Sequence, residues 1–174
     1  MPIKTISIPT DAKAVQRGEH LATILLCKYC HGDNLSGKLE FEVPGMLRIP
    51  TPNLTSGAGG VGSFYTDKDW VRAIRHSVGH DGRALFIMMS NQYHHLGDED
   101  VSALIAYLKS LPPADHKLPE RRFEPIGKLM MGAGLLPPFA ADQIDYASPA
   151  PAQPEPDVTV AYGEYLSRTC TEKT

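Results

Sequence analysis

Two cysteines and a histidine lie within five residues of each other and form the most distinctive reactive group of this chain. Residues 27–31 read Cys-Lys-Tyr-Cys-His. Thiols at this spacing can form thioether bonds to the two vinyl groups of a haem, and the histidine that follows can ligate the iron. The motif therefore predicts one covalent haem c, attached through Cys27 and Cys30, with His31 as an iron ligand.

Zinc binding and dithiol redox chemistry are the alternative uses of these cysteines. A structural zinc site needs four ligands, whereas a CxxC redox site needs neither the adjacent histidine nor a distant sulfur ligand. Cys170 is the only other cysteine in the sequence, and it follows a proline-rich segment. We therefore prefer the haem interpretation to both alternatives.

The composition indicates one modest domain without a strong charge. Of the 174 residues, 42% are hydrophobic, which is enough for a single core, and the formal net charge is −3. This charge gives no reason to expect nucleic-acid binding. No apolar run reaches the roughly 18 residues of a transmembrane helix, and residues 1–14 lack the apolar region of a secretory signal.

The expected cofactor nevertheless places the protein outside the cytoplasm, where haem c is attached as a rule of the cofactor class. We therefore expect an extracytoplasmic protein, in the periplasm or on the outer face of the cytoplasmic membrane. On this interpretation, a leader or anchor is absent from the chain.

Three amphipathic segments have the periodicity of helices. The first runs from Asp11 into the haem motif, the second from Thr66 to Gly79, and the third from about Gly97 to Leu111. Thr66 is suited to cap the second, and three carboxylates favour the start of the third. Glycines and prolines punctuate residues 32–64, so we expect irregular loops there. Because we find no useful alternating pattern, a sheet is not expected and the fold class is all-α.

The second axial position of the iron needs a further ligand, which largely decides between electron transfer and catalysis. The candidates are Met88, Met89, His94, His95 and, farther along, Met130 and Met131. A methionine on an extended loop between two helices suits an electron carrier, and Met89 is preferred. Both loop methionines could instead fill gaps in the core, and the histidines could be exposed loop residues.

Several residues outside the motif are candidates for contact with the haem. We expect the carbonyl of Pro52 to accept a hydrogen bond from the ring of His31 and so to orient it. Leu54 would pack on the edge of the haem ring. Hydrogen bonds to the haem propionates are expected from Asn53 and Arg83. Trp70 could contact the haem or donate to a propionate, although a core role is its alternative.

Beyond the haem domain, expected at residues 1–113, the sequence changes character. Residues 114–147 suggest a strap that packs on the domain, and residues 148–156 form a proline-rich linker. In the tail, residues 157–174, the run Tyr162-Gly163-Glu164-Tyr165-Leu166 repeats the pattern of Arg17–Leu21. The tail therefore resembles the start of a second haem domain, but no second attachment motif follows and one haem is expected.

The chain resembles class I cytochromes c, and more closely the cytochrome c subunits and modules that serve membrane-bound alcohol, aldehyde and sugar-acid dehydrogenases. The similarity covers about residues 12–113, and residues 125–145 resemble the strap that joins successive haem domains in such proteins. The motifs that carry it are Arg17–Leu21, Cys27–His31, Thr51–Thr55, Asp81-Gly82-Arg83 leading to Met89, and Asp98–Pro113.

This resemblance implies the class I cytochrome c fold, with helices and long loops wrapped around one haem. The first and last helices of the domain should cross, with Gly18 and Ala22 against Leu104, Tyr107 and Leu108. The resemblance also implies that His31 and Met89 ligate iron from opposite faces. In the family a proline directly follows the ligand, whereas Ser90-Asn91-Gln92 follows here, so the choice between Met88 and Met89 remains open.

The expected function is one-electron transfer without substrate chemistry. The carrier would pass electrons between a dehydrogenase, or a respiratory or photosynthetic complex, and a downstream acceptor. Redox proteins or a membrane-bound complex are its expected partners. The alternative is a haem oxidoreductase with an open or labile distal site, in which His94 or His95 acts as acid or base. A third interpretation is an interaction module of a larger respiratory complex.

Overall fold

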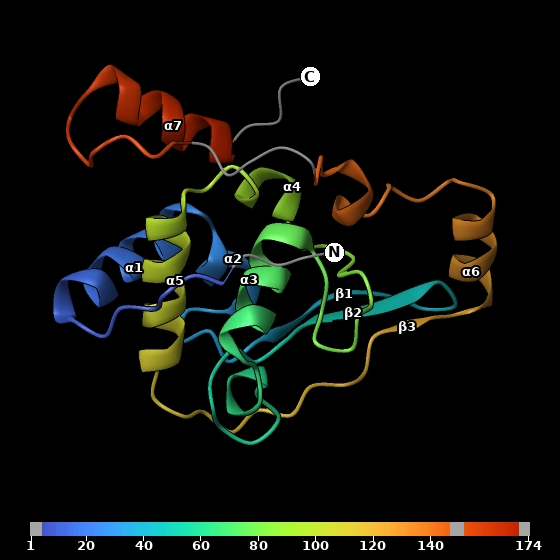
Figure 1. Cartoon of the computed structure of the whole chain (residues 1–174). Coiled ribbons are helices and arrows are strands. Elements are labelled where there is room, and N and C mark those ends of the chain that lie inside the picture. Colours follow the sequence, from blue (N-terminus) through green and yellow to red (C-terminus); the bar gives the residue numbers. More distant parts are fainter. Residues whose placement is uncertain (1–4, 147–151, 171–174) are drawn as a thin grey trace. The chain divides into compact units, whose positions relative to one another are not determined.

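The structure is a computed structural model that describes residues 5–146 and 152–170, with the side chain of Cys170 excepted. Its elements are α1 (Ala12–Ile24), α2 (Cys27–His31), β1 (Lys38–Val43), β2 (Leu47–Thr51), η1 (Val61–Ser63), α3 (Asp67–His76), α4 (Ser90–Tyr93), α5 (Asp98–Ser110), β3 (Arg122–Phe123), α6 (Pro125–Gly132), η2 (Ala140–Gln143) and α7 (Val160–Cys170) (Figure 1). Residues 148–151 of the expected linker and 171–174 of the expected tail lie outside the described residues.

The chain divides into two compact units. The first unit comprises Met1–Leu21, Tyr65–Tyr107 and Phe139–Thr174, and the second unit comprises Ala22–Phe64 and Leu108–Pro138. Among the described residues, no helix combines the length and the apolar character of a membrane span. We describe each unit by itself.

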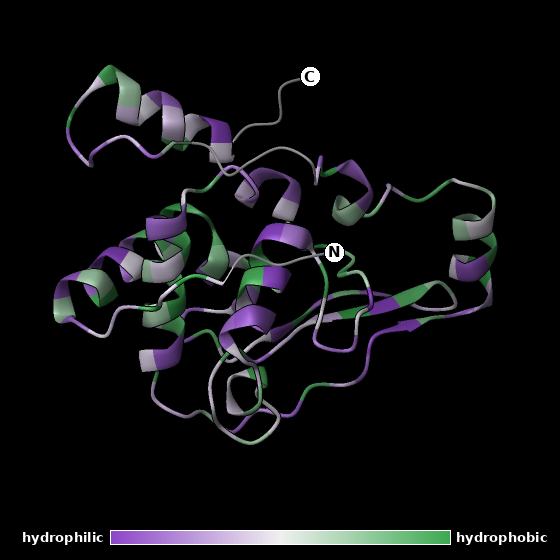
Figure 2. Cartoon of the chain, viewed as in Figure 1, coloured by the Kyte–Doolittle hydropathy of each residue, from purple (hydrophilic) through white to green (hydrophobic). Residues whose placement is uncertain are grey.

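In the first unit, α1 and α5 approach each other closely at Gly18. A Cβ atom at Gly18 would lie 2.0 Å from the carbonyl oxygen of Ala103 and 2.7 Å from Cβ of Tyr107. Only a residue without a side chain permits this approach. The crossing expected from the resemblance is therefore observed at this position. Hydrophobic residues alternate with polar ones along both helices (Figure 2), and Val101, Leu104 and Ile105 of α5 are buried.

Helix α3 begins where the sequence predicts. The Thr66 hydroxyl accepts a hydrogen bond from Asp69 N, and the Asp69 carboxylate accepts one from Thr66 N, which together form a capping box. This arrangement satisfies two backbone N–H groups that otherwise lack partners at a helix start. The helix ends at His76, before a left-handed Ser77, and buries Trp70 and Ile74.

The second unit contains an antiparallel sheet, so the expectation of an all-α fold without a sheet is wrong. In the described part of the chain its strand order is β1-β2-β3. The segment Lys38–Val43 does alternate, but its apolar residues Leu39, Phe41 and Val43 are exposed. This alternating segment is only six residues long and lies in the glycine- and proline-rich region for which the sequence predicts loops. The three helices expected from the sequence are present as α1, α3 and α5, and the sheet is additional.

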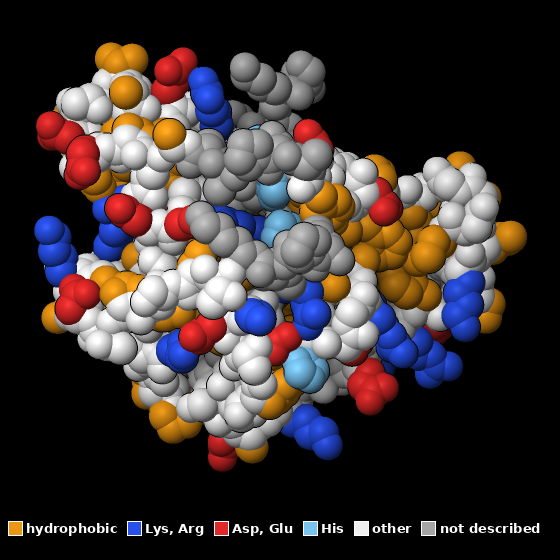
Figure 3. Space-filling model, in the orientation of Figure 1, with side chains coloured by type: hydrophobic (Ala, Val, Ile, Leu, Met, Phe, Trp, Pro, Cys, Tyr) orange, Lys and Arg blue, Asp and Glu red, His pale blue; other side chains and the backbone are white. Residues whose placement is uncertain are grey.

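Helix α6 follows the sheet and was not predicted. Pro125 occupies its first turn, where the missing N–H of proline is not needed. Gly127 lies against the turn between β1 and β2, because a Cβ atom there would be 2.0 Å from Met46 O. Ile126 and Leu129 are exposed, and Figure 3 shows hydrophobic side chains at the surface in the region of α6.

Candidate haem site

Helix α2 carries all three residues of the attachment motif. It follows Leu26, whose φ of 61° is left-handed, and ends at Gly32, whose φ is 81°. These two residues with positive φ mark the start and the end of a helix of five residues. Cys27 and His31 are buried and Cys30 is half-buried, and both thiols are free. One short helix therefore holds two thiols and an imidazole close enough together to bind one cofactor.

The ring of His31 is oriented by a backbone carbonyl. Its Nδ1 lies 2.9 Å from the carbonyl oxygen of Pro52, the acceptor expected from the sequence. A hydrogen bond from Nδ1–H leaves Nε2 as the nitrogen that can ligate a metal, and it fixes the direction of the ring. Burial lowers the pKa of His31, while the hydrogen bond to Pro52 opposes this shift. The ring is thus held neutral, the form in which imidazole binds iron.

Thr51 and Gly37 also hold α2 in place, a role that the sequence analysis assigned to neither residue. The Thr51 hydroxyl donates to the carbonyl oxygen of Cys30 at 2.6 Å. Gly37 N donates to the carbonyl oxygen of His31 at 2.7 Å. Gly37 has a φ of 82°, and a Cβ atom there would lie 2.5 Å from Thr51 O. Both residues act through contacts with residues distant in sequence, so local sequence patterns did not predict these contacts.

The two thiols are protonated in this environment. Burial raises the pKa of Cys27 to about 12, and the neighbouring Cys30 adds to this effect. Burial also raises the pKa of Cys30, with a further increase from Glu40. Because burial disfavours the charged thiolate, both sulfurs favour the thiol form in this environment.

Asn53 and Leu54 follow Pro52 and are both buried. The Asn53 amide donates to Ala114 O at 2.7 Å, and its oxygen accepts from Thr55 N at 2.9 Å. The bond to Ala114 joins the loop after β2 to the segment after α5, and the bond from Thr55 N lies within the loop. Leu54 N donates to Leu35 O at 2.8 Å. The propionate contact expected of Asn53 and the packing of Leu54 on a haem edge stay predictions.

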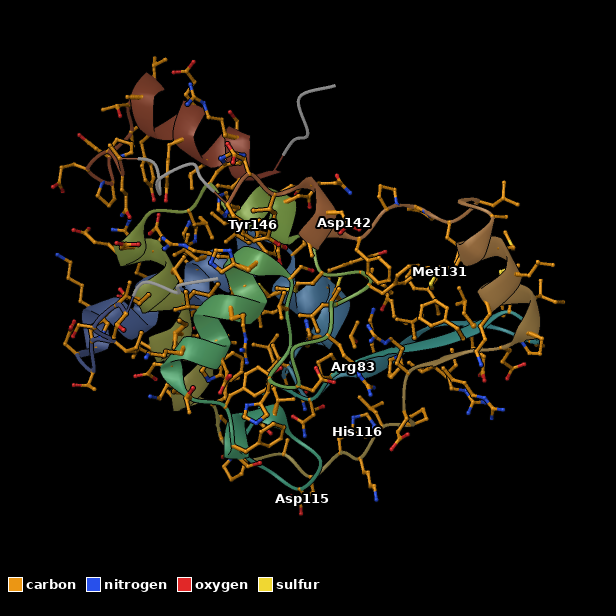
Figure 4. All side chains as sticks on the ribbon, turned by 45° about the vertical axis from the view of Figure 1, so that its right-hand side comes forward. Arg83, Asp115, His116, Met131, Asp142 and Tyr146 are labelled. Atoms are coloured by element: carbon orange, nitrogen blue, oxygen red, sulfur yellow. The ribbon has the colours of Figure 1, made fainter. Side chains whose placement is uncertain are left out.

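The start of the expected strap is bonded to the loop that precedes η1. The Asp115 carboxylate accepts from Ala58 N at 2.7 Å, and His116 N donates to Ala58 O at 3.0 Å. Asp115 and His116 are labelled in Figure 4. This segment is therefore held in the second unit by hydrogen bonds of the Asp115 side chain and the His116 backbone.

The methionine loop belongs to the first unit. Met88 and Met89 are both half-buried, and Met89 is the residue that precedes α4. The buried Ser90 donates from Oγ to Ala73 O of α3 at 2.9 Å. Farther back, Leu85 N donates to Ser77 O at 2.7 Å. Ser90, which the sequence analysis treated only as a departure from proline, thus anchors the loop to α3.

Trp70 and Arg83 also lie in the first unit. Trp70 is 2% exposed and packs edge-on against Tyr65, with ring centroids 5.0 Å apart. The Arg83 side chain is 79% exposed, and its Nε lies 3.6 Å from a carboxylate oxygen of Asp81. Trp70 therefore has a core environment, and Arg83 has the freedom to reach an anionic group.

His94 and His95 differ in their surroundings. His95 is exposed, whereas His94 is buried, with Nδ1 3.3 Å from the carbonyl oxygen of Arg75. His76, which the sequence analysis did not consider, lies beside it with ring centroids 5.7 Å apart. Burial, and then the charges of His94 and Arg75, lower the pKa of His76 to about 4. Tyr146, labelled in Figure 4, also packs near His76, with ring centroids 5.6 Å apart.

The chain matches the cytochrome c family over residues 15–112, a range that includes α1, the attachment helix α2 and α5. It belongs to the cytochrome c family. The resemblance to cytochrome c stated from the sequence is thus confirmed at the level of the family. Covalent haem c is the cofactor that this family implies, and two free thiols beside a neutral, oriented histidine fit it.

Curated relatives of this cytochrome c are named as subunits of dehydrogenases. It is 35% identical over 124 residues to the fructose dehydrogenase cytochrome subunit of Gluconobacter japonicus, covering 64% of this chain and 25% of the relative. It is 36% identical over 101 residues to the gluconate 2-dehydrogenase cytochrome c subunit of Pantoea cypripedii, covering 53% and 22%. It is 30% identical over 103 residues to the alcohol dehydrogenase (quinone) cytochrome c subunit of Gluconobacter oxydans (strain 621H), covering 56% and 21%. The aligned part of the chain spans about a quarter of these relatives' length.

Proposed function

We propose that this chain is a one-electron carrier with one haem c, attached through Cys27 and Cys30, and with His31 and Met89 as axial ligands. The observation that carries the proposal is the 2.9 Å contact between His31 Nδ1 and Pro52 O. It directs Nε2 as an iron ligand requires and raises the basicity of the ring. Bound haem iron supplies the one-electron redox chemistry. The protein's residues attach, orient and enclose it, without substrate chemistry.

The assignment of Met89 is supported by the way its loop is held. Met89 directly precedes Ser90, whose side chain is hydrogen-bonded to α3. The carbonyl oxygen of Met89 accepts hydrogen bonds from the backbone N–H groups of Gln92 and Tyr93. The backbone at Met89 is therefore fixed on its C-terminal side. Because the backbone is already fixed, less conformational entropy is lost when the weak thioether ligand binds the iron. Met88 lies one residue farther from this anchor and remains the alternative ligand.

Around the haem we propose contacts from Leu54, Trp70, Asn53 and Arg83. Leu54 and Trp70 would contribute apolar contact, and Asn53 and Arg83 would donate to the propionates. The support for Arg83 is its exposed guanidinium, which suits pairing with a carboxylate at the surface. We keep residues 114–147 as a strap and residues 157–174 as the start of a further domain within this proposal.

The partner that we propose is a membrane-bound dehydrogenase or respiratory complex on the extracytoplasmic side of the membrane, together with a downstream acceptor. The support is the set of relatives, which are named as cytochrome subunits of fructose, gluconate and alcohol dehydrogenases. Exchange of electrons with a separate acceptor calls for a small, transient interface, commonly below about 1,200 Å².

The ferric absorption spectrum tests the axial ligands. The full chain, matured in a host that attaches haem c, should show the weak far-red band of methionine sulfur bound to ferric iron. Met89→Ala should abolish this band, lower the reduction potential and let cyanide bind. Met88→Ala is the matched control and should retain the band. The opposite pattern would make Met88 the ligand. A native protein that lacks the band and binds cyanide readily would favour the haem oxidoreductase instead.

A further inference from the structure

Helix α7 buries one side and exposes the other. Tyr165 and Thr169 are buried, Tyr162 and Leu166 are half-buried, and the remaining described side chains of the helix are exposed. These four residues recur at intervals of three and four, so they lie on one face of the helix. Helix α7 belongs to the first unit, where it contacts α4. Figure 1 shows the two helices near each other.

The buried face of α7 carries a hydroxyl group that bonds to the start of α5. The Tyr165 hydroxyl donates to Oδ2 of Asp100 at 2.7 Å and accepts from Gly97 N at 2.8 Å. Burial raises the pKa of Tyr165, so the phenol keeps its proton and can donate. Ahead of α7, the side-chain oxygen of Gln153 accepts from Asp100 N at 3.2 Å. Backbone N–H groups at a helix start have no partner within the helix, and here a later segment supplies two.

Asp100 is the centre of this arrangement. Its side chain is fully buried, and its Oδ1 accepts from Arg17 Nε of α1 at 2.6 Å. A buried carboxylate is stable only when charged and polar partners replace the water that it has lost. Arg17 supplies the charge and Tyr165 supplies a hydrogen bond to the second oxygen. Asp100 therefore links α1, α5 and α7.

Helix α7 does not use its glycine as α1 does, although the two helices share a sequence pattern. A Cβ atom at Gly18 of α1 would collide with α5, whereas a Cβ atom at Gly163 would have no described atom within 4 Å. Close backbone approach therefore holds α1 to α5, while polar side chains connect α7 to α5.

We propose that the start of α5, with Asp100 and Arg17, is a docking surface for α7 that recognises a phenol hydroxyl and an amide oxygen. Its occupant is the segment 152–169 of this chain. Docking satisfies Gly97 N, Asp100 N and the second carboxylate oxygen at once. It thereby fastens α7 and the end of the proline-rich linker to the helix pair α1 and α5. This inference does not depend on the identity of the haem ligands.

Hydrogen–deuterium exchange of the full, haem-loaded chain tests the proposal. Tyr165→Phe removes the hydroxyl and keeps the ring. It should speed exchange of the amides of residues 161–169 by about tenfold or more, the factor that corresponds to one lost buried hydrogen bond. Tyr162→Phe is the matched control, because the Tyr162 ring stacks on Tyr165 with centroids 6.0 Å apart. Its exchange should stay within about twofold of the unsubstituted chain, because Tyr162 is not part of the proposed polar contacts.

Equal exchange in the two tyrosine variants would overturn the proposal, because apolar packing alone would then hold α7. If Tyr165→Phe instead unfolds the whole domain, Gln153→Ala decides the question, since it leaves the phenol and the carboxylate in place. Faster exchange in residues 161–169 of Gln153→Ala, with an unchanged haem spectrum, supports the docking surface. Unchanged exchange there contradicts it.

Discussion

Ser90 Oγ donates a hydrogen bond to the carbonyl oxygen of Ala73, 2.9 Å away, and so joins the loop of Met89 to α3. The bond is buried at both ends. The resemblance expects a proline at this position, which would stiffen the loop through its ring. Serine instead restrains the loop by a contact with a neighbouring helix.

Ser90→Ala should loosen the methionine loop. Loss of the donor leaves the Ala73 carbonyl oxygen buried without its partner, and the free energy of unfolding should fall by about 1–3 kcal/mol. Urea denaturation monitored by circular dichroism measures this change. Ser102→Ala is the control, because the Ser102 hydroxyl bonds only one turn back within α5, to Glu99 O. If both variants lost the same free energy of unfolding, the contact of Ser90 with α3 would contribute no more to stability than a local hydrogen bond.

Thr51→Val should weaken the attachment of α2 to β2. The change preserves the shape of the side chain but removes the hydroxyl that donates to Cys30 O. We expect a loss of about 1–2 kcal/mol in the free energy of unfolding. Thr51→Ser keeps the hydroxyl and should lose less. Denaturant titration of both variants gives the comparison, and a valine variant as stable as the serine variant would contradict the role of the hydroxyl.

Gly18→Ala and Gly163→Ala should have opposite effects. A Cβ atom at Gly18 would collide with Ala103 O, so the alanine variant should lose about 2–3 kcal/mol of stability. Gly163 has no described atom within 4 Å of such a Cβ, and alanine there should add about 0.5–1 kcal/mol through helix propensity. Thermal unfolding of the two variants measures both signs. If Gly18→Ala left the stability unchanged, α1 and α5 could move apart without a loss of stability.

Acid should destabilise the protein through His76. Its pKa in the folded protein is about 4, below the ordinary value of 6.5, because burial and nearby positive charges disfavour protonation. The unfolded chain therefore binds the proton more readily, and stability falls as the pH drops from about 6.5 toward 4. Because water reaches the half-buried ring, we expect His76 to contribute about 1–2 kcal/mol of this loss.

The His76 effect is measured as a difference between variants, since other groups also titrate in acid. Urea denaturation at several pH values from 7 to about 4.5 should show a shallower decline for His76→Phe than for the unsubstituted chain. His95→Gln removes an exposed histidine nearby and should follow the unsubstituted chain. Parallel curves for His76→Phe and the unsubstituted chain would refute the assignment.

The parts of the fold that follow from local chemistry were predictable. Thr66 and Asp69 form a capping box, so the start of α3 could be read from two residues three positions apart. The haem motif likewise has all its reactive groups in one short segment, Cys27–His31. Both features depend on residues that lie close together in the sequence, and such local patterns can be recognised without a structure.

The parts that depend on distant contacts were not predictable in this way. Ser90 is important because Ala73 lies opposite it, and Thr51 because Cys30 does. The sheet was missed for a different reason, since the short alternating segment Lys38–Val43 lies among glycines and prolines that predict loops. His76 and His94 are separate in sequence, so the part of the lowered pKa of His76 that comes from His94 could not be predicted from local sequence.

The contacts of Asp100 also constrain the order of folding. Its partners Arg17 and Tyr165 are 83 and 65 residues away along the chain. Contacts of such long range form late and slowly. Cys27 and Cys30, in contrast, are already present in a growing chain before α5 has been made. Because closing such long loops of chain costs more entropy than closing the short contacts within α2, the contacts of Asp100 are expected to slow the folding of the first unit.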